Sequence, residues 1–335
     1  MHKIFKKIHL KDIAPKIKNC YVKLDLKFLK DLLMQASKSK IPSKNKEFAK
    51  KIGCKFNKNY KESLTIRNWI RGYRKLQISQ LIKIMKYTNY SWVEVEKNIL
   101  FLTARKDSGK VFIKFPIEIN ERFGCIIGHI LGDGAIDKKY SQIFFSNSNK
   151  TLLEEFKDKM KSIFDVKPRI WIQKKNKFEE KTEWLKRVND LNEILPNHCV
   201  GLFYPRICGA LLHAIFGKFA YGQQKKITKE LTFTSKNFRK SMIKAFFDDE
   251  GYVCPESRMI RLYQDNKRIL YEFKKLLNSQ DIQSNPIRHY TKRNQKRYYF
   301  NITGKENFKK FDESISFSSK HKNQRLRSLV SKYYP

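Results

Sequence analysis

The sequence predicts an α+β protein in which one module occurs twice behind a helical N-terminal segment. Two stretches, IIGHILGDG (residues 126–134) and IKAFFDDEG (residues 243–251), are each an apolar run that ends in an acid and a glycine. The acids, Asp133 and Glu250, are 117 positions apart, and apolar residues further along repeat at the same offset. The repeated pairs are Leu152 and Ile269, Leu153 and Leu270, Phe156 and Phe273, and Met160 and Leu277. Each copy therefore predicts a helix, a short extended segment and an amphipathic helix.

The charge of the chain predicts a polyanionic partner. The 335 residues include 72 Lys and Arg against 32 Asp and Glu, a formal net charge of +40. Such an excess repels itself strongly in isolation, and each DNA phosphate that it neutralises releases condensed counterions. Biased codon usage is the alternative explanation, but it would raise Glu together with Lys. Double-stranded DNA is the expected partner.

Several classes of protein are excluded by composition. No run of 18 apolar residues predicts a membrane span, and the N-terminus lacks the apolar core of a signal peptide, so a cytoplasmic protein without a membrane partner is expected. The six cysteines contain no CxxC pair, so neither a zinc site nor a disulfide scaffold is indicated. The histidines have no ligand-like spacing, and His129 and His213 are expected to be packed or hydrogen-bonded.

The first patterned segment of the chain, from about Leu24 to Leu102, is predicted to be helical. It resembles the helix-turn-helix of the phage-repressor (Cro) family, with KEFAKKIG (residues 46–53) preceding a recognition-type helix in LTIRNWIRG (residues 64–72). The connector CKFNKNYKESL is longer than the usual turn of that family. The resemblance implies an all-α DNA-binding unit in which Ile66 and Trp69 pack inward. The implied groove-facing residues are Thr65, Arg67, Asn68 and Arg71. A helical bundle with a solvated basic face is the alternative.

A polar linker, TARKDSGK (residues 103–110), separates this segment from the repeats. It predicts an N-terminal domain over residues 1–104 and a second domain over residues 105–335. The second domain divides into halves of about 112–228 and 229–335.

The first motif helix is predicted to begin near Pro116 and to end at Gly134. The second should begin after Thr234 or Ser235 and end at a left-handed Gly251. A carboxylate in the last helical turn faces the negative end of the helix dipole, at a cost of roughly 0.3 to 1 kcal/mol. A divalent cation such as Mg²⁺ would offset that cost. Two acids in solvated loops are the alternative.

Small residues predict that the two motif helices pack together. Gly124, Gly128 and Gly132 recur every four positions on one helix face, and Ser241 and Ala245 match the first two in the second copy. Parallel packing along this face would place Asp133 and Glu250 at the same end of the pair.

Residues 112–335 resemble the single-chain LAGLIDADG homing endonucleases, which are named for this motif. The resemblance implies a duplicated αββαββα fold whose antiparallel, saddle-shaped sheets bind DNA. It implies that Asp133 and Glu250 are catalytic and hold Mg²⁺, with Mn²⁺ as an alternative. The chain departs from the motif at His129, Leu131 and Asp249, and Asp249 occupies a position that is normally small.

Further roles follow from the same resemblance. Gln264 and Asn147 match residues that position water, and Lys320 and Lys225 (or Lys226) match basic catalytic residues. A hairpin over residues 287–302 mixes basic, amide and aromatic residues, as do RIWIQKKNKF and TEWLKRV in the first half. Its expected DNA-binding residues are Arg288, Lys292, Arg293, Lys296 and Arg297.

Together these features predict a monomeric, magnesium-dependent endonuclease that cuts double-stranded DNA at a long asymmetric site. The chain opens with Met and closes with SKYYP, without the terminal His-Asn of an intein, so a free-standing protein is expected. Two alternatives stay open. One is a DNA-binding transcription regulator that does not cut, and the other is a maturase that binds intron RNA.

Overall fold

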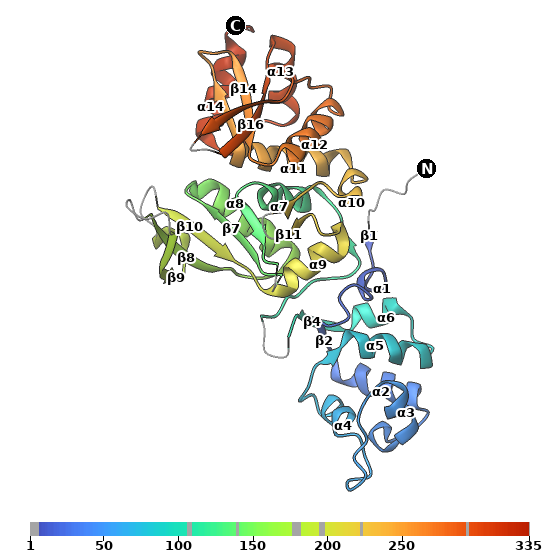
Figure 1. Cartoon of the computed structure of the whole chain (residues 1–335). Coiled ribbons are helices and arrows are strands. Elements are labelled where there is room, and N and C mark those ends of the chain that lie inside the picture. The colour runs from blue at the N-terminus through green and yellow to red at the C-terminus, as the bar shows by residue number, and fades with distance from the viewer. Residues whose placement is uncertain are drawn as a thin grey trace.

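Three units follow one another along an elongated molecule (Figure 1). The computed structural model describes residues 7–105, 109–138, 141–175, 182–193, 198–221, 224–292 and 295–334. The N-terminal unit lies at one end, the first repeat in the middle and the second repeat at the other end. Within the described ranges, every helix is too short or too polar to cross a membrane.

The N-terminal unit combines short helices with a small sheet. Its helices are α1 (Leu10–Ile13), α2 (Leu26–Ser37), α3 (Lys46–Lys51), α4 (Leu64–Ile70), α5 (Ile78–Ile84) and α6 (Trp92–Lys97), with 3-10 turns at Pro42–Lys44 and Met85–Tyr87. Its strands β2 (Tyr21–Leu24), β3 (Leu76–Gln77) and β4 (Ile99–Thr103) form an antiparallel sheet in the order β3-β2-β4. The prediction of an all-α unit was therefore wrong. The segment ILFLT of β4 is rich in the apolar residues that pair well in strands.

The N-terminal unit contacts the first repeat in several places. Strand β1 (Lys7–Ile8) pairs with β5 (Ile117–Glu118), just before the first motif helix. The Lys16 ammonium donates to the carbonyl oxygen of Ala214 at 2.7 Å. An isolated bridge joins Leu102 to Val111 across the linker.

The first repeat has one strand more than expected. Its elements are α7 (Glu121–Leu131), β6 (Gly134–Ile136), β7 (Ile143–Asn147), α8 (Lys150–Phe164), β8 (Arg169–Lys175), β9 (Thr182–Val188), a 3-10 turn (Leu191–Glu193), β10 (Cys199–Phe203) and α9 (Arg206–Phe216). Its sheet is antiparallel, in the order β6-β7-β10-β8-β9. The expected αββαββα pattern was wrong here, because three strands follow α8. The additional β9 lies at the sheet edge.

The second repeat follows the predicted pattern. After β11 (Ala220–Tyr221), β12 (Gln224–Lys225) and α10 (Lys229–Thr232) come α11 (Lys236–Glu250), β13 (Gly251–Cys254), β14 (Met259–Gln264), α12 (Lys267–Asn278), β15 (Arg288–Lys292), β16 (Gln295–Ile302) and α13 (Lys305–Ser314). The sheet order is β13-β14-β16-β15, all antiparallel. A last helix, α14 (Lys320–Ser331), closes the chain. Residues Asp133 and Glu250 thus lead from a motif helix into the first strand of each sheet.

The motif-helix boundaries differ in part from those predicted. Helix α11 begins after the Ser235 cap, as expected. Helix α7 begins only at Glu121, because the residues after Pro116 are held in strand β5, and it ends at Leu131 rather than at Gly134. Gly251 has φ −86° rather than a left-handed φ, because it begins strand β13. A Cβ there would lie 2.5 Å from the Phe247 carbonyl oxygen, so close approach of the backbone explains the glycine.

Candidate metal centre and nucleic-acid interface

The motif helices α7 and α11 lie side by side at the boundary between the repeats (Figure 1). A Cβ built on Gly124 would lie 2.2 Å from the carbonyl oxygen of Phe238, and one on Gly128 would lie 2.4 Å from that of Met242. Only hydrogen fits at these positions. The predicted packing along the glycine face of α7 is therefore confirmed, but on α11 these glycines meet Phe238, Met242 and Ala245 rather than Ser241.

The two acids that end these helices have matching surroundings. The Asn147 amide donates to the Asp133 carboxylate at 2.9 Å, and the Gln264 amide donates to the Glu250 carboxylate at 3.0 Å. Asn147 and Gln264 end strands β7 and β14, which are equivalent in the two repeats. The second strand of each repeat thus orients the acid that ends its motif helix.

The surroundings of both acids disfavour their ionised forms, and Asp133 lies close enough to Glu250 to affect its ionisation. Burial, and then the negative charge of Asp249, raises the pKa of Asp133 to about 7, although Asp133 borders solvent. Burial, and then the negative charge of Asp133, raises the pKa of Glu250 to about 7. The partly desolvated site therefore disfavours two ionised carboxylates more than the nearby cations favour them.

A buried ion pair lies beneath the acids and joins the two helices. Both side-chain oxygens of Asp249 are 3.1 Å from His129 Nδ1, and both side chains are fully buried. Burial alone would lower the pKa of His129, but the Asp249 carboxylate raises it well above its ordinary value. Asp249 also accepts from the Asp133 backbone N–H at 3.3 Å. His129 is hydrogen-bonded, as predicted.

Two of the three departures from the motif, His129 and Asp249, thus compensate each other. Gly132 leaves the space that Asp249 fills, since a Cβ on Gly132 would be 2.7 Å from the Asp249 Cβ. His129 supplies the partner that the buried carboxylate needs.

Two partly buried lysines lie at the ends of the motif helices. The Lys225 ammonium donates to the carbonyl oxygen of Gly132, and the Lys322 ammonium donates to that of Asp248 at 2.5 Å. Burial lowers the pKa of both lysines, although the nearby acids act in the opposite direction. Cations at helix C-termini satisfy unpaired carbonyl groups and the dipole. The positive charges of the lysines therefore compensate part of the unfavourable interaction between the acids and the negative ends of the helix dipoles.

Lys320, the basic residue expected from the sequence in the second half, does not lie in this group. It is exposed at the start of α14, whereas Lys322 faces α11. The Asp248 carboxylate fixes this orientation by accepting from the backbone N–H groups of Ser318 and Ser319, both at 2.9 Å. Helical periodicity shows that two residues two positions apart lie on different faces, but not which face meets α11.

The group suits a hard divalent cation. Asp133 and Glu250 supply carboxylate oxygens, which are ligand atoms that Mg²⁺ and Mn²⁺ prefer. The raised pKa values of the acids show that positive charge would be favourable here.

Neutralising one acid is expected to stabilise the metal-free protein at pH 8. A carboxyl group whose folded pKa is about 7 binds protons that the unfolded chain has released, so its contribution to stability falls as pH rises from about 4 to 7. Asp133→Asn and Glu250→Gln should therefore raise the thermal midpoint at pH 8 in chelator, and much less at about pH 5. Glu313→Gln, at an exposed site, is the control. Midpoints lowered by both variants at pH 8 would contradict the pKa assignment.

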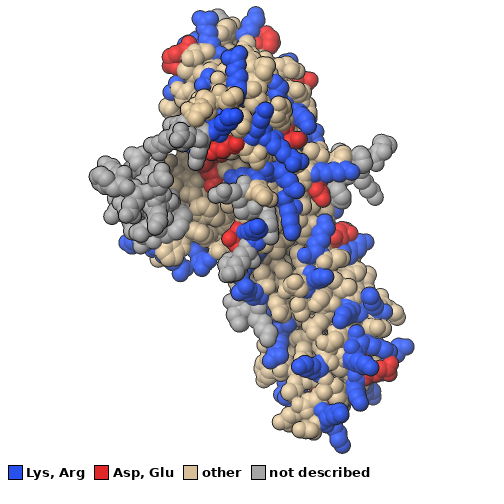
Figure 2. Space-filling view, viewed as in Figure 1, with Lys and Arg blue, Asp and Glu red and all other residues tan. Residues whose placement is uncertain are grey.

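The outer face of the second sheet is basic and aromatic. Strand alternation places Phe300 and Ile302 in the core and Tyr299 on the opposite face. The Arg261 guanidinium lies 4.5 Å from the centre of the Tyr299 ring, and Tyr263, Tyr290 and Tyr299 have ring centres 6.0 to 6.2 Å apart. On the face of the whole molecule seen in Figure 2, Lys and Arg are scattered along its length and outnumber Asp and Glu.

The residues predicted to bind DNA in this hairpin divide between the two faces. Arg288 pairs across the sheet with Tyr299, and Arg297 with Tyr290, so both lie on the outer face. Lys296 is exposed but alternates to the opposite face. The side chain of Lys292 and all of Arg293 lie outside the described residues.

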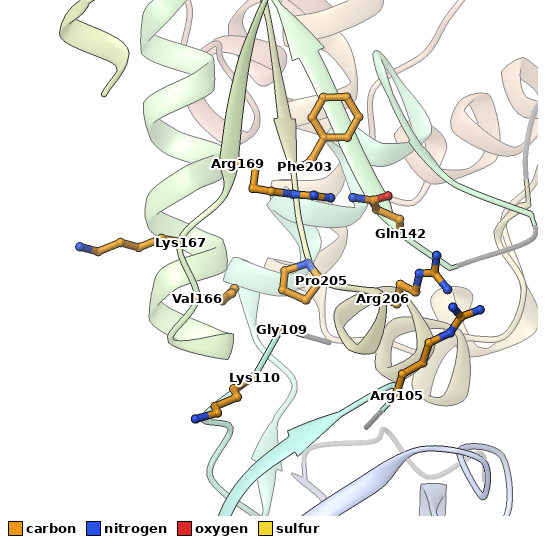
Figure 3. A pocket seen from close by; sticks show the side chains of 10 residues that line it. All are labelled: Arg105, Gly109, Lys110, Gln142, Val166, Lys167, Arg169, Phe203, Pro205 and Arg206. Atoms are coloured by element: carbon orange, nitrogen blue, oxygen red, sulfur yellow. The ribbon is translucent and has the colours of Figure 1, made fainter. Parts of the chain in front are cut away.

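A cation-lined cavity opens beside the first sheet (Figure 3). It has a volume of about 970 Å³ and lies between the linker, the start of β8 and the start of α9. Its described lining residues include five cations and no acid. The cations are Arg105, Lys110, Lys167, Arg169 and Arg206. Gln142, Phe203 and Pro205 add polar and apolar surface, and none of the residues of the acid group lines the cavity.

The expected groove-facing residues of the N-terminal unit lie on or next to α4. Ile66 and Trp69 are buried, as predicted, so Thr65 and Asn68 lie toward the partly exposed side of the helix. Arg67 is paired with Glu62 at 2.6 Å. Arg71 follows the helix and is exposed.

Comparison with a family model agrees with the second repeat. Residues 221–316 match the LAGLIDADG-like domain. This range contains α11, Glu250 and the whole second sheet, but it does not include Asp133.

Three curated proteins of Methanocaldococcus jannaschii have segments similar to this chain. A probable translation initiation factor IF-2 is 27% identical over 231 residues, 66% of this chain and 17% of that protein. A glutamine--fructose-6-phosphate aminotransferase is 24% identical, over 66% of this chain and 18% of that protein. The RNA polymerase subunit Rpo1C is 26% identical, over 75% and 26%. The chain thus spans about a quarter or less of these relatives.

Solved structures include similar folds at low identity. I-DmoI in complex with DNA and Mn is 15% identical with a TM-score of 0.39, covering 58% of this chain and 96% of that chain. Full-length DUF199/WhiA from Thermatoga maritima is 16% identical with a TM-score of 0.40, covering 64% of this chain and 62% of that one.

Proposed function

We propose that this protein is a metal-dependent endonuclease that cuts double-stranded DNA at a specific, asymmetric site. The observation that carries the proposal is the meeting of Asp133 and Glu250 at the ends of two helices packed backbone to backbone. A structural helix pair gains nothing from two partly desolvated carboxylates whose pKa values are both raised to about 7. Because one chain supplies both acids, a monomer is sufficient.

The chain's own residues suit phosphodiester hydrolysis. Mg²⁺ held by Asp133 and Glu250 would supply activation of water and neutralisation of charge on the phosphate. Asn147 and Gln264 hold those carboxylates in place, and their amide groups would position the attacking water. The ammonium groups of Lys225 and Lys322 lie close enough to the acids to stabilise negative charge that develops on a bound phosphate.

The DNA would lie along the outer faces of the two sheets. Arg261, Arg288 and Arg297 offer phosphate contacts and base readout, and the tyrosines beside them offer apolar contact. The cation-lined cavity extends this surface toward the N-terminal unit. There α4 would add a second DNA-contacting surface through Thr65, Asn68 and Arg71.

The similarity to these relatives indicates a shared protein segment and does not indicate a particular activity. Their names describe three different activities, and the segment similar to this chain is at most 26% of each. A segment shared by proteins of such different activities is independent of those activities, so none of them transfers to this chain.

A DNA-binding regulator without cleavage is the second candidate. It is favoured by the two lysines, which already contact the ends of both motif helices without any metal. In that case the ammonium groups would be permanent structural partners of the acids. Binding of intron RNA is the third candidate function, and an experiment must distinguish it from the two DNA-binding functions.

The decisive experiment incubates the purified chain with fragmented genomic DNA or a randomised plasmid library. Cleavage at rare sites in Mg²⁺ or Mn²⁺, absent in chelator, would support the endonuclease. Sequence-specific retention of DNA without cleavage in either metal would favour the regulator. Preference for a structured RNA competitor at matched salt would overturn DNA as the substrate.

Substitutions of Lys322 and Lys320 test which of the two is the basic catalytic residue of the second half. Lys322→Met should lower single-turnover cleavage by roughly 10- to 100-fold, because a partly buried ammonium beside the acids is lost. Lys320→Met removes the same charge from an exposed position and should change mainly the salt dependence of binding. Equal losses of cleavage in the two variants would contradict the assignment of Lys322.

A further inference from the structure

Three potential metal ligands meet on the far side of His129 from Asp249. A thiol, an imidazole nitrogen and a carboxylate oxygen, from Cys125, His129 and Glu155, all lie within 4.8 Å of one another. Cys125 and His129 are one turn apart on α7, and Glu155 is on α8, which packs against it. The cluster therefore lies within the first repeat, apart from the pair of acids between the repeats.

The imidazole of His129 is oriented as a metal ligand would be. Its Nδ1 is fixed by the Asp249 carboxylate, and its Nε2 is fully buried and makes no hydrogen bond of ordinary geometry, although the Cys125 thiol lies near enough to influence the pKa of the imidazole. A buried polar atom without a partner is costly and calls for an explanation. Metal-binding histidines commonly use one nitrogen for the metal while a carboxylate accepts from the other. The Asp249–His129 pair has that arrangement.

The second repeat shows that packing alone does not require these residues. At the same offset of 117 positions, Met242 replaces Cys125 and Phe246 replaces His129, while Glu272 matches Glu155. Phe246 stacks on Phe273 with ring centres 3.8 Å apart, which fills the equivalent space with apolar atoms. The first repeat instead places a thiol and an imidazole in a core otherwise made of Phe145 and Phe156.

We infer that Cys125, His129 and Glu155 bind a divalent transition metal, with Zn²⁺ the best match, between α7 and α8. Thiolate, imidazole and carboxylate are the ligands that Zn²⁺ uses, with water completing a tetrahedral site. The metal would displace the proton of the Cys125 thiol and the proton of His129 Nε2, leaving Nδ1–H donating to Asp249. The sequence signal of this site is the CxxxH spacing of Cys125 and His129 on one helix, which differs from the CxxC spacing typical of many zinc sites.

The test is cobalt binding by the full-length chain in the absence of DNA and Mg²⁺. One Co²⁺ per chain should bind with the charge-transfer absorption of a thiolate ligand and the visible bands of tetrahedral geometry, and Zn²⁺ should displace it. Cys125→Ser should remove the charge-transfer band. Cys199→Ser, at a half-buried cysteine outside the cluster, should retain it.

Glu155→Gln provides a variant that should fold, because Glu155 is only half-buried on α8. Its affinity for Co²⁺ should fall at least about tenfold, the lower range for loss of a supporting partner. The inference is overturned if the wild-type complex lacks the thiolate band. It is also overturned if both Cys125→Ser and Glu155→Gln bind Co²⁺ as the wild type does. Because the assay contains no DNA, its outcome is separate from that of the cleavage experiment.

Discussion

Asp133→Asn and Glu250→Gln should each abolish DNA cleavage while leaving DNA binding intact. Each change removes a carboxylate that would hold the catalytic cation, so single-turnover cleavage should fall by more than the roughly 10- to 100-fold typical for supporting partners of a metal ligand. Binding should be unchanged or tighter, because one negative charge near the phosphates is removed. The measurements are cleavage of a supercoiled plasmid that carries the target and fluorescence anisotropy on the same site in Ca²⁺.

The ionisation of the acids adds a pH dependence to this prediction. Because the pKa of each acid is raised to about 7, cation binding must displace protons below that pH. Wild-type cleavage at limiting Mg²⁺ should therefore rise from about pH 6 to about pH 8 and become less dependent on pH at saturating Mg²⁺. Substantial cleavage by either amide variant would exclude these acids as the catalytic pair. The acids would then be structural partners of Lys225 and Lys322.

Gly124→Ala and Gly128→Ala should separate the motif helices. The added methyl groups would lie 2.2 Å and 2.4 Å from backbone carbonyl oxygens of α11, which cannot move aside as a flexible side chain can. Overpacking of this kind costs about 1 to 3 kcal/mol, of which the better helix propensity of Ala offsets about 0.5 to 1 kcal/mol. Each variant should therefore lower the thermal midpoint of the repeats.

The functional effect of these glycine variants should exceed their effect on stability. A displacement of about 1 Å between Asp133 and Glu250 is enough to cost on the order of a hundredfold in rate. Asn237→Ala, at an exposed position in the first turn of α11, is the control. If Gly124→Ala and Gly128→Ala match this control in midpoint and in cleavage, close packing of the helices is not what assembles the site.

Much of this arrangement could be predicted from local features of the sequence. The offset of 117 residues identified the repeat, and the recurrence of small residues every four positions identified the face along which α7 meets α11. Both features act within a single helix or between two copies of one pattern. They could therefore be interpreted without knowing how distant parts of the chain pack.

The strand content of two segments was harder to predict. The N-terminal unit contains a small sheet because Ile99–Thr103 finds a partner in β2, which lies some 75 residues earlier in the chain. The additional β9 pairs only with β8 at a sheet edge. Strand pairing depends on partners distant in sequence, so periodicity alone does not establish it.

By itself, the sequence determined the repeat of a motif helix, an extended segment and an amphipathic helix, the two acids at the helix ends and the glycine face of α7. The tertiary structure alone decided that Lys322 rather than Lys320 lies beside Asp248, and that His129 pairs with Asp249. The physical reason is that periodicity assigns residues to a helix face, whereas the neighbour of that face is chosen by packing over the whole chain. Buried charges depend most on that choice, because each needs a partner within hydrogen-bonding distance.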